Sequence, residues 1–312
     1  MLRGARSTDG RWWLWAAGTV AAVLGATALA LCSRGSGGRP AAQLVVFAAS
    51  SLGAAFGELA ERFERAHPGV RVQLECGGSL WLVRRLLELG ARCDVLALAD
   101  AELFEEIQGL RARTDEPQRF ARDRLVLAFR EGAPGVELVR AGRWYDALLA
   151  PGVRFGRADE RAAPVGYRTL LCWRLAEAHY GLAGLAARLE QACPPARVRS
   201  SLGALSALLV AGELDYAFTY GAAARAAGLA VQGLPREIDF SEPALAERYG
   251  AVSLELGGGG PGSGLWLRGS PVRYAMACVR ASGEPELAGR WCALVLGAEG
   301  QAVLARHGLL PP

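Results

Sequence analysis

The chain has no lysine, so all 35 of its basic residues are arginine, and it has only three histidines among 312 residues. Arginine at every basic position indicates a GC-rich coding bias and carries no functional meaning. The histidines, His67, His179 and His307, fall in no metal-binding or catalytic-triad spacing, and neither GxSxG nor HExxH occurs. These absences argue against the common serine and zinc hydrolases, and we predict that the chain is not an enzyme.

Excess positive charge is also absent beyond the N-terminus. Residues 1–40 contain five arginines and one aspartate, which accounts for the whole formal net charge of +4. The remaining chain is neutral, whereas a nucleic-acid binder needs a basic stripe. We therefore exclude nucleic acid as a partner. An anion bound by this chain must be held by local dipoles and hydrogen bonds.

The first 40 residues have the pattern of an export signal or a membrane anchor. Three arginines precede the uncharged, mostly apolar run Trp12–Leu31, which at about 1.5 Å per residue is long enough to span a bilayer. Cys32 follows directly, as at a lipoprotein site, although Leu31 is bulky where a small residue usually stands, and a flexible tether comes next. Three fates of this segment remain as alternatives: a lipid on Cys32, an uncleaved helix or a cleaved signal. In each case the positive-inside rule places the C-terminal bulk of the chain outside the cytoplasm.

Six further cysteines could pair in an oxidising compartment, but six cysteines allow 15 pairings and the sequence does not choose among them. No CxxC or Cys/His spacing indicates a metal site, and buried apolar thiols are the alternative. The six are Cys76, Cys93, Cys172, Cys193, Cys278 and Cys292.

Strand and helix patterns alternate along the rest of the chain. The first series predicts strands at 44–47, 70–74 and 94–98, with helices at 52–63, 79–87 and 101–107. The second predicts strands at 124–129, 153–156 and 214–220, with helices at 144–149, 166–180 and 201–212. The C-terminal stretch adds strands at 252–256 and 272–279 and helices at 287–296 and 301–307.

This order predicts an α/β fold of two lobes, each a mostly parallel sheet with flanking helices. We expect residues 1–40 to be the signal or anchor with its tether, 41–121 plus 241–312 to form lobe I, and 122–240 to form lobe II. Such a layout leaves a cleft between the lobes, where ligands commonly bind. The glycine-rich stretch 257–264 lacks a following Gly-Lys-Ser/Thr and is interpreted as a hairpin loop.

Serines stand at three predicted strand-to-helix junctions: Ser50 and Ser51, Ser79, and Ser200 and Ser201. The first N–H groups of a helix have no partner within it, and the helix dipole favours negative charge there. Serine is also the ordinary N-cap residue, so capping is the alternative role at each junction. Several such junctions in one two-lobed chain are what an uncharged oxyanion site requires.

Longer stretches resemble the periplasmic molybdate/tungstate-binding proteins of ABC importers, in particular the archaeal-type branch. The resemblance spans nearly all of the chain from residue 43 onward. Its motifs include FAASSLGAAF, ECGGS, DVLALAD, APVGYRTLL and LDYAFTY. It implies the class II periplasmic-binding-protein fold, an extracytoplasmic location, and an ABC permease with its ATPase as partners, for a monomer attached to the membrane through its N-terminal segment.

The resemblance also implies the site, with molybdate or tungstate as ligand and no cofactor. Carried over by motif, the oxyanion-binding residues are Ser50, Ser51, Ser79, Pro164, Val165, Leu202 and Tyr220. A core aromatic at a strand end is the alternative for Tyr220. A sulfate-type binding protein or a membrane-tethered oxyanion sensor is the alternative function.

The chain departs from the archaeal-type branch at two positions. Members often carry an aspartate just before the proline and a glutamate at the later helix start, and these carboxylates can bond the metal directly. Here Ala163 and Leu202 stand at those positions. We therefore expect no directly coordinated metal. Asp159 in the nearby GRAD turn is the alternative metal ligand, but a turn or cap role is preferred for it.

Overall fold

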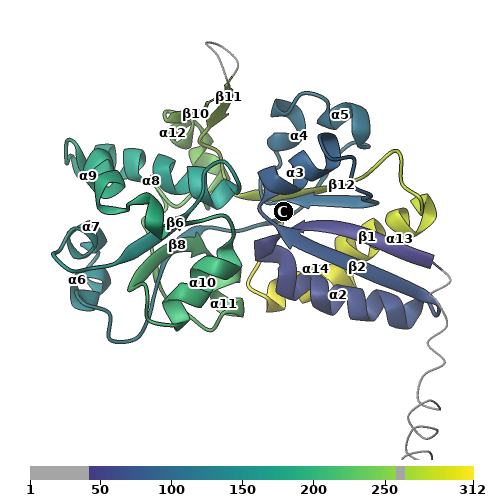
Figure 1. The fold of residues 1–312 in the computed structure, drawn as a ribbon, viewed down its shortest axis with the longest axis horizontal. Coiled ribbons are helices and arrows are strands. Elements are labelled where there is room, and N and C mark those ends of the chain that lie inside the picture. The colour runs from purple at the N-terminus through teal and green to yellow at the C-terminus, as the bar shows by residue number, and fades with distance from the viewer. Residues whose placement is uncertain (1–41, 258–263) are drawn as a thin grey trace, which may run out of the picture. The chain divides into compact units, whose positions relative to one another are not determined.

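Two five-stranded sheets organise the computed structural model, which describes residues 42–257 and 264–312 (Figure 1). In the first sheet, β1 pairs in parallel with β2 and β3, whereas β12 is antiparallel to β3 and β4. Four strands therefore run one way and β12 runs the other. The order is β2 (Val70–Gly77), β1 (Ala42–Ala49), β3 (Val95–Leu98), β12 (Arg273–Cys278) and β4 (Gln118–Arg122).

The second sheet repeats this plan. β6 pairs in parallel with β7 and β8, and β5 is antiparallel to β8 and β9, so β5 is the reversed strand. The order is β7 (Val198–Arg199), β6 (Phe155–Ala158), β8 (Tyr216–Tyr220), β5 (Leu125–Phe129) and β9 (Ala230–Gly233). The chain passes from the first sheet to the second after Arg122 and returns between Gly233 and Arg273.

Helices cover the first sheet because its strands are apolar on both faces. Six of the eight residues of β1 are buried, as expected for a strand with helices on both sides. Helix α2 (Gly53–Ala66) buries Phe56, Leu59 and Phe63 at helical spacing. The other helices are α3 (Ser79–Leu87), α4 (Leu103–Glu106), α5 (Leu110–Arg113), α13 (Pro285–Leu296) and α14 (Ala298–Arg306), and the 3-10 turn η1 (Ser50–Leu52) leads into α2.

The longest helix of the second sheet is α8 (Pro164–Tyr180). Pro164 occupies its first turn, where a missing N–H costs nothing, and Gly181 ends it in the left-handed region at φ 66°. The others are α6 (Val136–Arg140), α7 (Trp144–Leu148), α9 (Leu185–Ala192), α10 (Leu202–Val210) and α11 (Gly221–Ala226), with the 3-10 turn η2 (Pro195–Arg197) before β7. We call each sheet with its helices a lobe.

A separate hairpin, β10 (Ser253–Leu256) with β11 (Leu265–Arg268), follows the turn η3 (Pro243–Leu245) and helix α12 (Ala246–Tyr249). Its two antiparallel strands flank the glycine-rich stretch, so no helix follows the glycines as a phosphate loop would require. The two flanking strands pair as the predicted hairpin requires, whereas residues 258–263 of the stretch lie outside the described residues.

The predicted α/β class with flanking helices is confirmed, and four of five strands in each sheet share one direction. Several boundaries were wrong by a few residues: α8 begins at Pro164 instead of Gly166, and β6 begins at Phe155 instead of Val153. The predicted lobe limits stay predictions. Among the described residues, no helix is long and apolar enough to cross a membrane. The predicted anchor and Cys32 lie outside the described residues.

Candidate functional site

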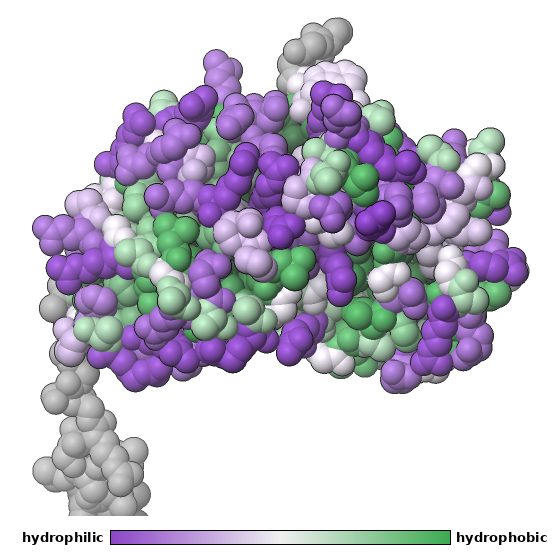
Figure 2. All heavy atoms as spheres, turned by 180° about the vertical axis from the view of Figure 1, so that it is seen from behind, coloured by the Kyte–Doolittle hydropathy of each residue, from purple (hydrophilic) through white to green (hydrophobic). Residues whose placement is uncertain are grey.

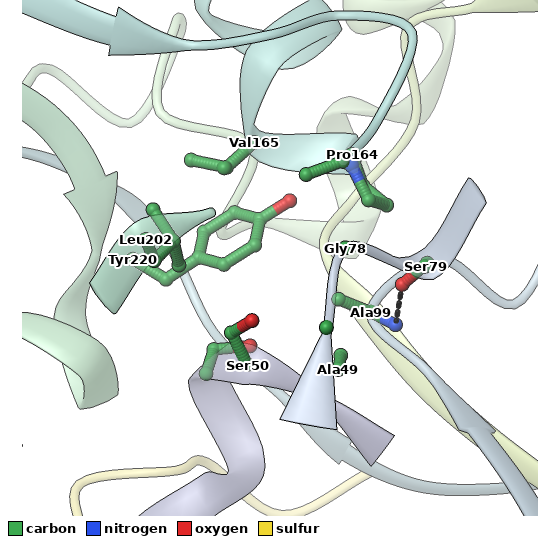
Figure 3. Close-up of a pocket in the computed structure, with 12 residues that line it drawn as sticks. Ala49, Ser50, Gly78, Ser79, Ala99, Pro164, Val165, Leu202 and Tyr220 are labelled. Carbon is green, nitrogen blue, oxygen red and sulfur yellow. Dashed lines mark hydrogen bonds between the residues drawn. The ribbon is translucent and has the colours of Figure 1, made fainter. Parts of the chain in front are cut away.

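A small cavity lies where the carboxyl ends of three parallel strands of the first lobe face helix starts of the second (Figure 3). Ala49 ends β1, Gly77 ends β2 and Ala99 follows β3, and all three line the cavity. The cavity volume is about 10 Å³, close to what a single buried water requires. In this arrangement of the lobes, such a cavity favours a ligand of few atoms over a sugar, an amino acid or a peptide.

All seven residues predicted for the oxyanion site line this one cavity. The serines come from the first lobe, and the starts of α8 and α10 and the end of β8 come from the second. They are Ser50, Ser51, Ser79, Pro164, Val165, Leu202 and Tyr220. Ala49, Gly77, Gly78, Ala99 and Ala163 complete the lining. No charged side chain is among these twelve residues, so dipoles and hydroxyls supply the polarity.

Ser79 is the first residue of α3, yet its side chain does not cap that helix. The preceding Gly78 is the N-cap, and no side-chain cap is formed. Instead the backbone N–H of Ala99 donates to Ser79 Oγ at 3.1 Å (Figure 3). Because this oxygen accepts a bond from the protein, the hydroxyl proton remains available as a donor to a ligand.

Ser51 is arranged in the same way. The hydroxyl of Tyr274 donates to Ser51 Oγ at 2.9 Å, and it also lies 3.5 Å from Asp123 Oδ2. Burial raises the pKa of Tyr274 far above its usual value, so the phenol keeps its proton at neutral pH. Ser51 is itself only 6% exposed, and its own proton is left to donate.

Tyr220 ends β8, and Figure 3 shows its ring between Ser50 and Val165. Arg168 Nη1 donates to the Tyr220 hydroxyl oxygen at 2.9 Å. Burial raises the pKa of Tyr220, only partly offset by the charge of Arg168, so the phenol is neutral. Tyr220, Ser51 and Ser79 thus share one arrangement, in which each oxygen accepts a bond within the protein and each proton can be donated to a ligand.

Three helix starts add backbone dipoles. The N-termini of α3, α8 and α10 contribute Ser79, Pro164, Val165 and Leu202 to the lining, and N–H groups in a first turn have no partner within their helix. Ser201 acts as the ordinary cap of α10, because its Oγ accepts from the Ala204 N–H at 3.3 Å. The capping role considered for the serines therefore holds at Ser201 and fails at Ser79.

Comparison with known proteins identifies the family. Residues 44–310 match the model of the bacterial extracellular solute-binding proteins. The chain belongs to this family. Its predicted membership of a solute-binding family is thereby confirmed, as is the expectation of a binding protein's fold.

Several relatives of this solute-binding protein are named for a ligand, among them the following two. A putative ABC transporter molybdenum-binding protein of Haloferax volcanii is 34% identical over 271 residues, covering 85% of this chain and 81% of its own. A molybdate/tungstate-binding protein of Pyrococcus abyssi is 27% identical over 304 residues, covering 88% of this chain and 87% of its own.

Solved structures show the fold of this solute-binding protein at low sequence identity. The periplasmic molybdate-binding protein of Azotobacter vinelandii superposes with a TM-score of 0.58 at 19% identity, covering 86% of this chain and 99% of that one. The sulfate-binding protein SubI of Mycobacterium tuberculosis superposes with a TM-score of 0.57 at 15% identity, covering 86% of this chain and 87% of that one. The fold alone therefore does not choose between the two oxyanions.

Asp159 does not line the cavity of the solute-binding protein. Its Oδ1 accepts from the Arg161 N–H at 2.8 Å and its carbonyl accepts from the Ala162 and Ala163 N–H groups at 3.1 Å, as in a turn. No cluster of three or more potential metal-ligating acidic, histidine or cysteine side chains occurs within 42–257 and 264–312. Ala163 and Leu202, the two positions where the resemblance led us to look for carboxylates, both line the cavity.

Sequence reasoning missed two groups of residues. The small residues at the ends of β1, β2 and β3 could have been found from the rule that ligands bind beyond the carboxyl ends of parallel strands. The second group lies directly behind the lining: Arg168, Asp100, Tyr167 and Tyr274. Tyr167 and Arg168 were visible in the APVGYR motif, but nothing in the sequence indicated that they would contact Asp100.

Proposed function

We propose that this solute-binding protein captures molybdate or tungstate outside the cytoplasm and delivers the anion to an ABC importer. The observation that carries the proposal is a cavity of about 10 Å³ whose lining offers hydroxyl donors and helix starts but no charged side chain. The names of the relatives in Haloferax and Pyrococcus support the choice of ligand.

The arrangement of donors suits a fully deprotonated oxyanion. Ser51, Ser79 and Tyr220 each accept within the protein and can each donate one proton. A carboxylate in the lining would repel such a dianion, and none is present. Five to seven charge-assisted bonds of about 1.5–3 kcal/mol each suffice for nanomolar capture, which needs about 12 kcal/mol after ordering costs. In this account Ser50, Pro164, Val165 and Leu202 complete the oxyanion-binding set.

Delivery requires an ABC permease and its ATPase as partners, and it requires no cofactor and no catalysis. We further propose attachment to the membrane through residues 1–40, by a lipid on Cys32 or by an uncleaved helix. Residues 41–121 plus 241–312 and residues 122–240 would then act as the two lobes that enclose the anion. We also propose that the protein acts as a monomer; on the face in Figure 2, apolar areas are interspersed with polar ones.

Isothermal titration with molybdate, tungstate, sulfate and phosphate tests the ligand. We expect molybdate and tungstate to bind at least roughly a hundredfold tighter than sulfate, a difference of about 2.7 kcal/mol. Sulfate has the same shape but is smaller, so the selection must come from the size of the closed cavity. Equal affinity for sulfate would favour the alternative, a sulfate-type binding protein, and no oxyanion binding at all would contradict the proposal.

A further inference from the structure

Arg168 is a buried charge directly behind the cavity. It lies on α8 and is 1% exposed. Nη1 donates to the carbonyl of Ala99 and to the hydroxyl of Tyr220, both at 2.9 Å, and Nη2 lies 3.0 Å from Asp100 Oδ2. Although burial opposes ionisation of Asp100, the adjacent guanidinium holds the pKa of that carboxyl below its usual value. The pair is therefore charged, with Arg168 held in place from the first lobe.

These contacts connect the two lobes at the ligand site. Ala99 and Asp100 follow β3 in the first sheet, whereas Tyr220 ends β8 in the second. Asp100 also accepts from the hydroxyl of Tyr167, so both side chains of the Tyr-Arg pair in APVGYR contact one carboxylate. A buried ion pair adds little net stability compared with apolar packing. Its geometry, not its energy, is what distinguishes this site.

We propose that Arg168 is a positioning residue for anion capture, and that it acts by fixing the hydroxyl of Tyr220. This inference rests on the proposed function. A phenol has one proton and can accept a bond on its oxygen. With Arg168 donating to that oxygen, the proton is left to point at the anion, and the charge of the guanidinium strengthens the bond that the phenol donates. Arg168 does not line the cavity, so it reaches the anion through Tyr220.

Lysine cannot replace the guanidinium in this role. Arg168 uses two nitrogens of one planar group to reach Tyr220 and Asp100 simultaneously. An ammonium is a compact point charge without that fork, so Arg168→Lys keeps the charge but loses the fixed direction. This substitution therefore separates the geometry of the contact from its charge.

The test is a double-mutant cycle on molybdate affinity, measured by isothermal titration of the wild type, Arg168→Lys, Tyr220→Phe and the double variant. We expect each single change to weaken binding roughly ten- to a hundredfold, the range for one charge-assisted bond. In the Tyr220→Phe background, Arg168→Lys should weaken binding by less than about threefold, because the hydroxyl it positions is gone.

Arg154→Lys is the matched control. Arg154 pairs with the buried Asp215 at 3.2 Å and lines no part of the cavity. The substitution Arg154→Lys should lower the melting temperature and leave molybdate affinity unchanged. If the affinity losses of the two single variants multiply in the double variant, the two residues act independently and the proposed role of Arg168 is wrong. Unchanged affinity in Arg168→Lys would also overturn that role, while leaving the proposed function intact. A wild type that binds no oxyanion would overturn the proposed function and this inference together.

A second inference concerns two thiols in the first lobe. Cys278 ends β12 and Cys292 lies in α13, and their sulfurs are 3.6 Å apart. A disulfide needs about 2.05 Å, so the sulfurs must approach by roughly 1.5 Å, which is the scale of side-chain rotation. The family is extracellular, and disulfides form in such oxidising compartments. The structure thus selects one pairing where the sequence left 15 open.

We infer that Cys278 and Cys292 form a disulfide in the exported protein. The two thiols lose two protons and two electrons, one S–S bond forms, and a disulfide oxidant of the thiol–disulfide exchange class is reduced to its dithiol. Cys278 is partly exposed and so is accessible to that oxidant, whereas Cys292 is 7% exposed. The bond would tie strand β12 to the helix that follows it.

Alkylation of the exported full chain, unfolded without reductant, tests the bond by peptide mass. Cys278 and Cys292 should stay unlabelled until a reductant is added, while the buried thiols Cys172 and Cys193 should label without it. Reductant should lower the melting temperature by roughly 5–10 °C in the wild type and leave Cys278→Ser/Cys292→Ser unchanged. Labelling of both cysteines without reductant would overturn the inference.

Discussion

At the scale of single residues, the site depends on where hydroxyl oxygens obtain their hydrogen bonds. Ser51 accepts from Tyr274, Ser79 accepts from the Ala99 N–H, and Tyr220 accepts from Arg168. In each case a donor from elsewhere in the fold occupies the oxygen and leaves the proton for the ligand. A ligand that must itself donate a proton gains nothing from such a lining, which favours a fully deprotonated anion.

Ser51→Ala and Ser79→Ala should each weaken molybdate binding by about 1.5–3 kcal/mol, because each removes one charge-assisted donor. Isothermal titration gives the loss directly, as roughly ten- to a hundredfold in affinity. Ser282→Ala is the control, since Ser282 donates to Asp94 at 2.7 Å and does not line the cavity. An equal loss in Ser282→Ala would mean that the serine effects arise from general destabilisation.

X-ray absorption on the tungstate complex should show four oxygen neighbours and no protein carboxylate bonded to the metal. The reason is that Ala163 and Leu202 line the cavity and no acid does. Asp159 is engaged in its own turn, so Asp159→Asn should change affinity little. Two further oxygen neighbours at longer distance would contradict this, and their loss in Asp159→Asn would identify Asp159 as their source.

At the scale of helices and strands, continuous apolar runs and helical spacing were sufficient to predict β1, α2, α3 and β3, because local burial determines these patterns. The neighbours of β12 could not be predicted. Its pairing with β3 and β4 depends on contacts between residues more than a hundred positions apart, for which local periodicity carries no information. The contact between Arg168 and Asp100 also joins distant parts of the sequence and could not be predicted either. The seven lining residues were predicted because whole motifs resemble those of a known family.

The start of α3 provides a test of contact between the lobes. A Cβ on Gly78 would lie 2.2 Å from the Ala162 carbonyl oxygen, which also accepts from the Trp81 N–H at 3.3 Å. Gly78 has φ −66° and ψ 137°, which alanine adopts freely, so Gly78→Ala introduces a clash without backbone strain. We expect Gly78→Ala to weaken molybdate binding more than roughly tenfold by preventing this close approach, as measured by titration.

Gly57→Ala is the matched control for that substitution. Gly57 lies inside α2, and a Cβ there meets nothing within 4 Å. Alanine should raise the free energy of unfolding by about 0.5–1 kcal/mol and leave affinity unchanged. Unfolding of the anion-free protein should be similar in Gly78→Ala and wild type, because the clash arises only where the lobes touch. A large loss of stability in anion-free Gly78→Ala would show that this contact is needed for folding.

At the scale of the whole described chain, polar contacts join the lobes around the cavity. They include the Trp81 N–H to the Ala162 carbonyl, Tyr167 to Asp100, and Arg168 to Ala99 and Asp100. Two chain crossings join the sheets, one at residues 123–124 and one between 233 and 273. Two crossings between the sheets are suited to hinge bending, in which the lobes separate without unfolding.

Small-angle scattering should therefore show a smaller radius of gyration with molybdate than without it. In the proposed site the anion would bond to groups of both lobes, so it would bind the closed form more tightly and shift the population toward that form. Gly78→Ala should keep the larger radius even at high molybdate, because its methyl group occupies the space into which the Ala162 carbonyl must move. Gly57→Ala should close on molybdate as the wild type does.

An unchanged radius of gyration in the wild type would mean that the lobes are already closed without anion. In that case the loss of affinity in Gly78→Ala would have to come from distortion of a preformed site, and crystals of that variant would show its lobes displaced in the absence of ligand.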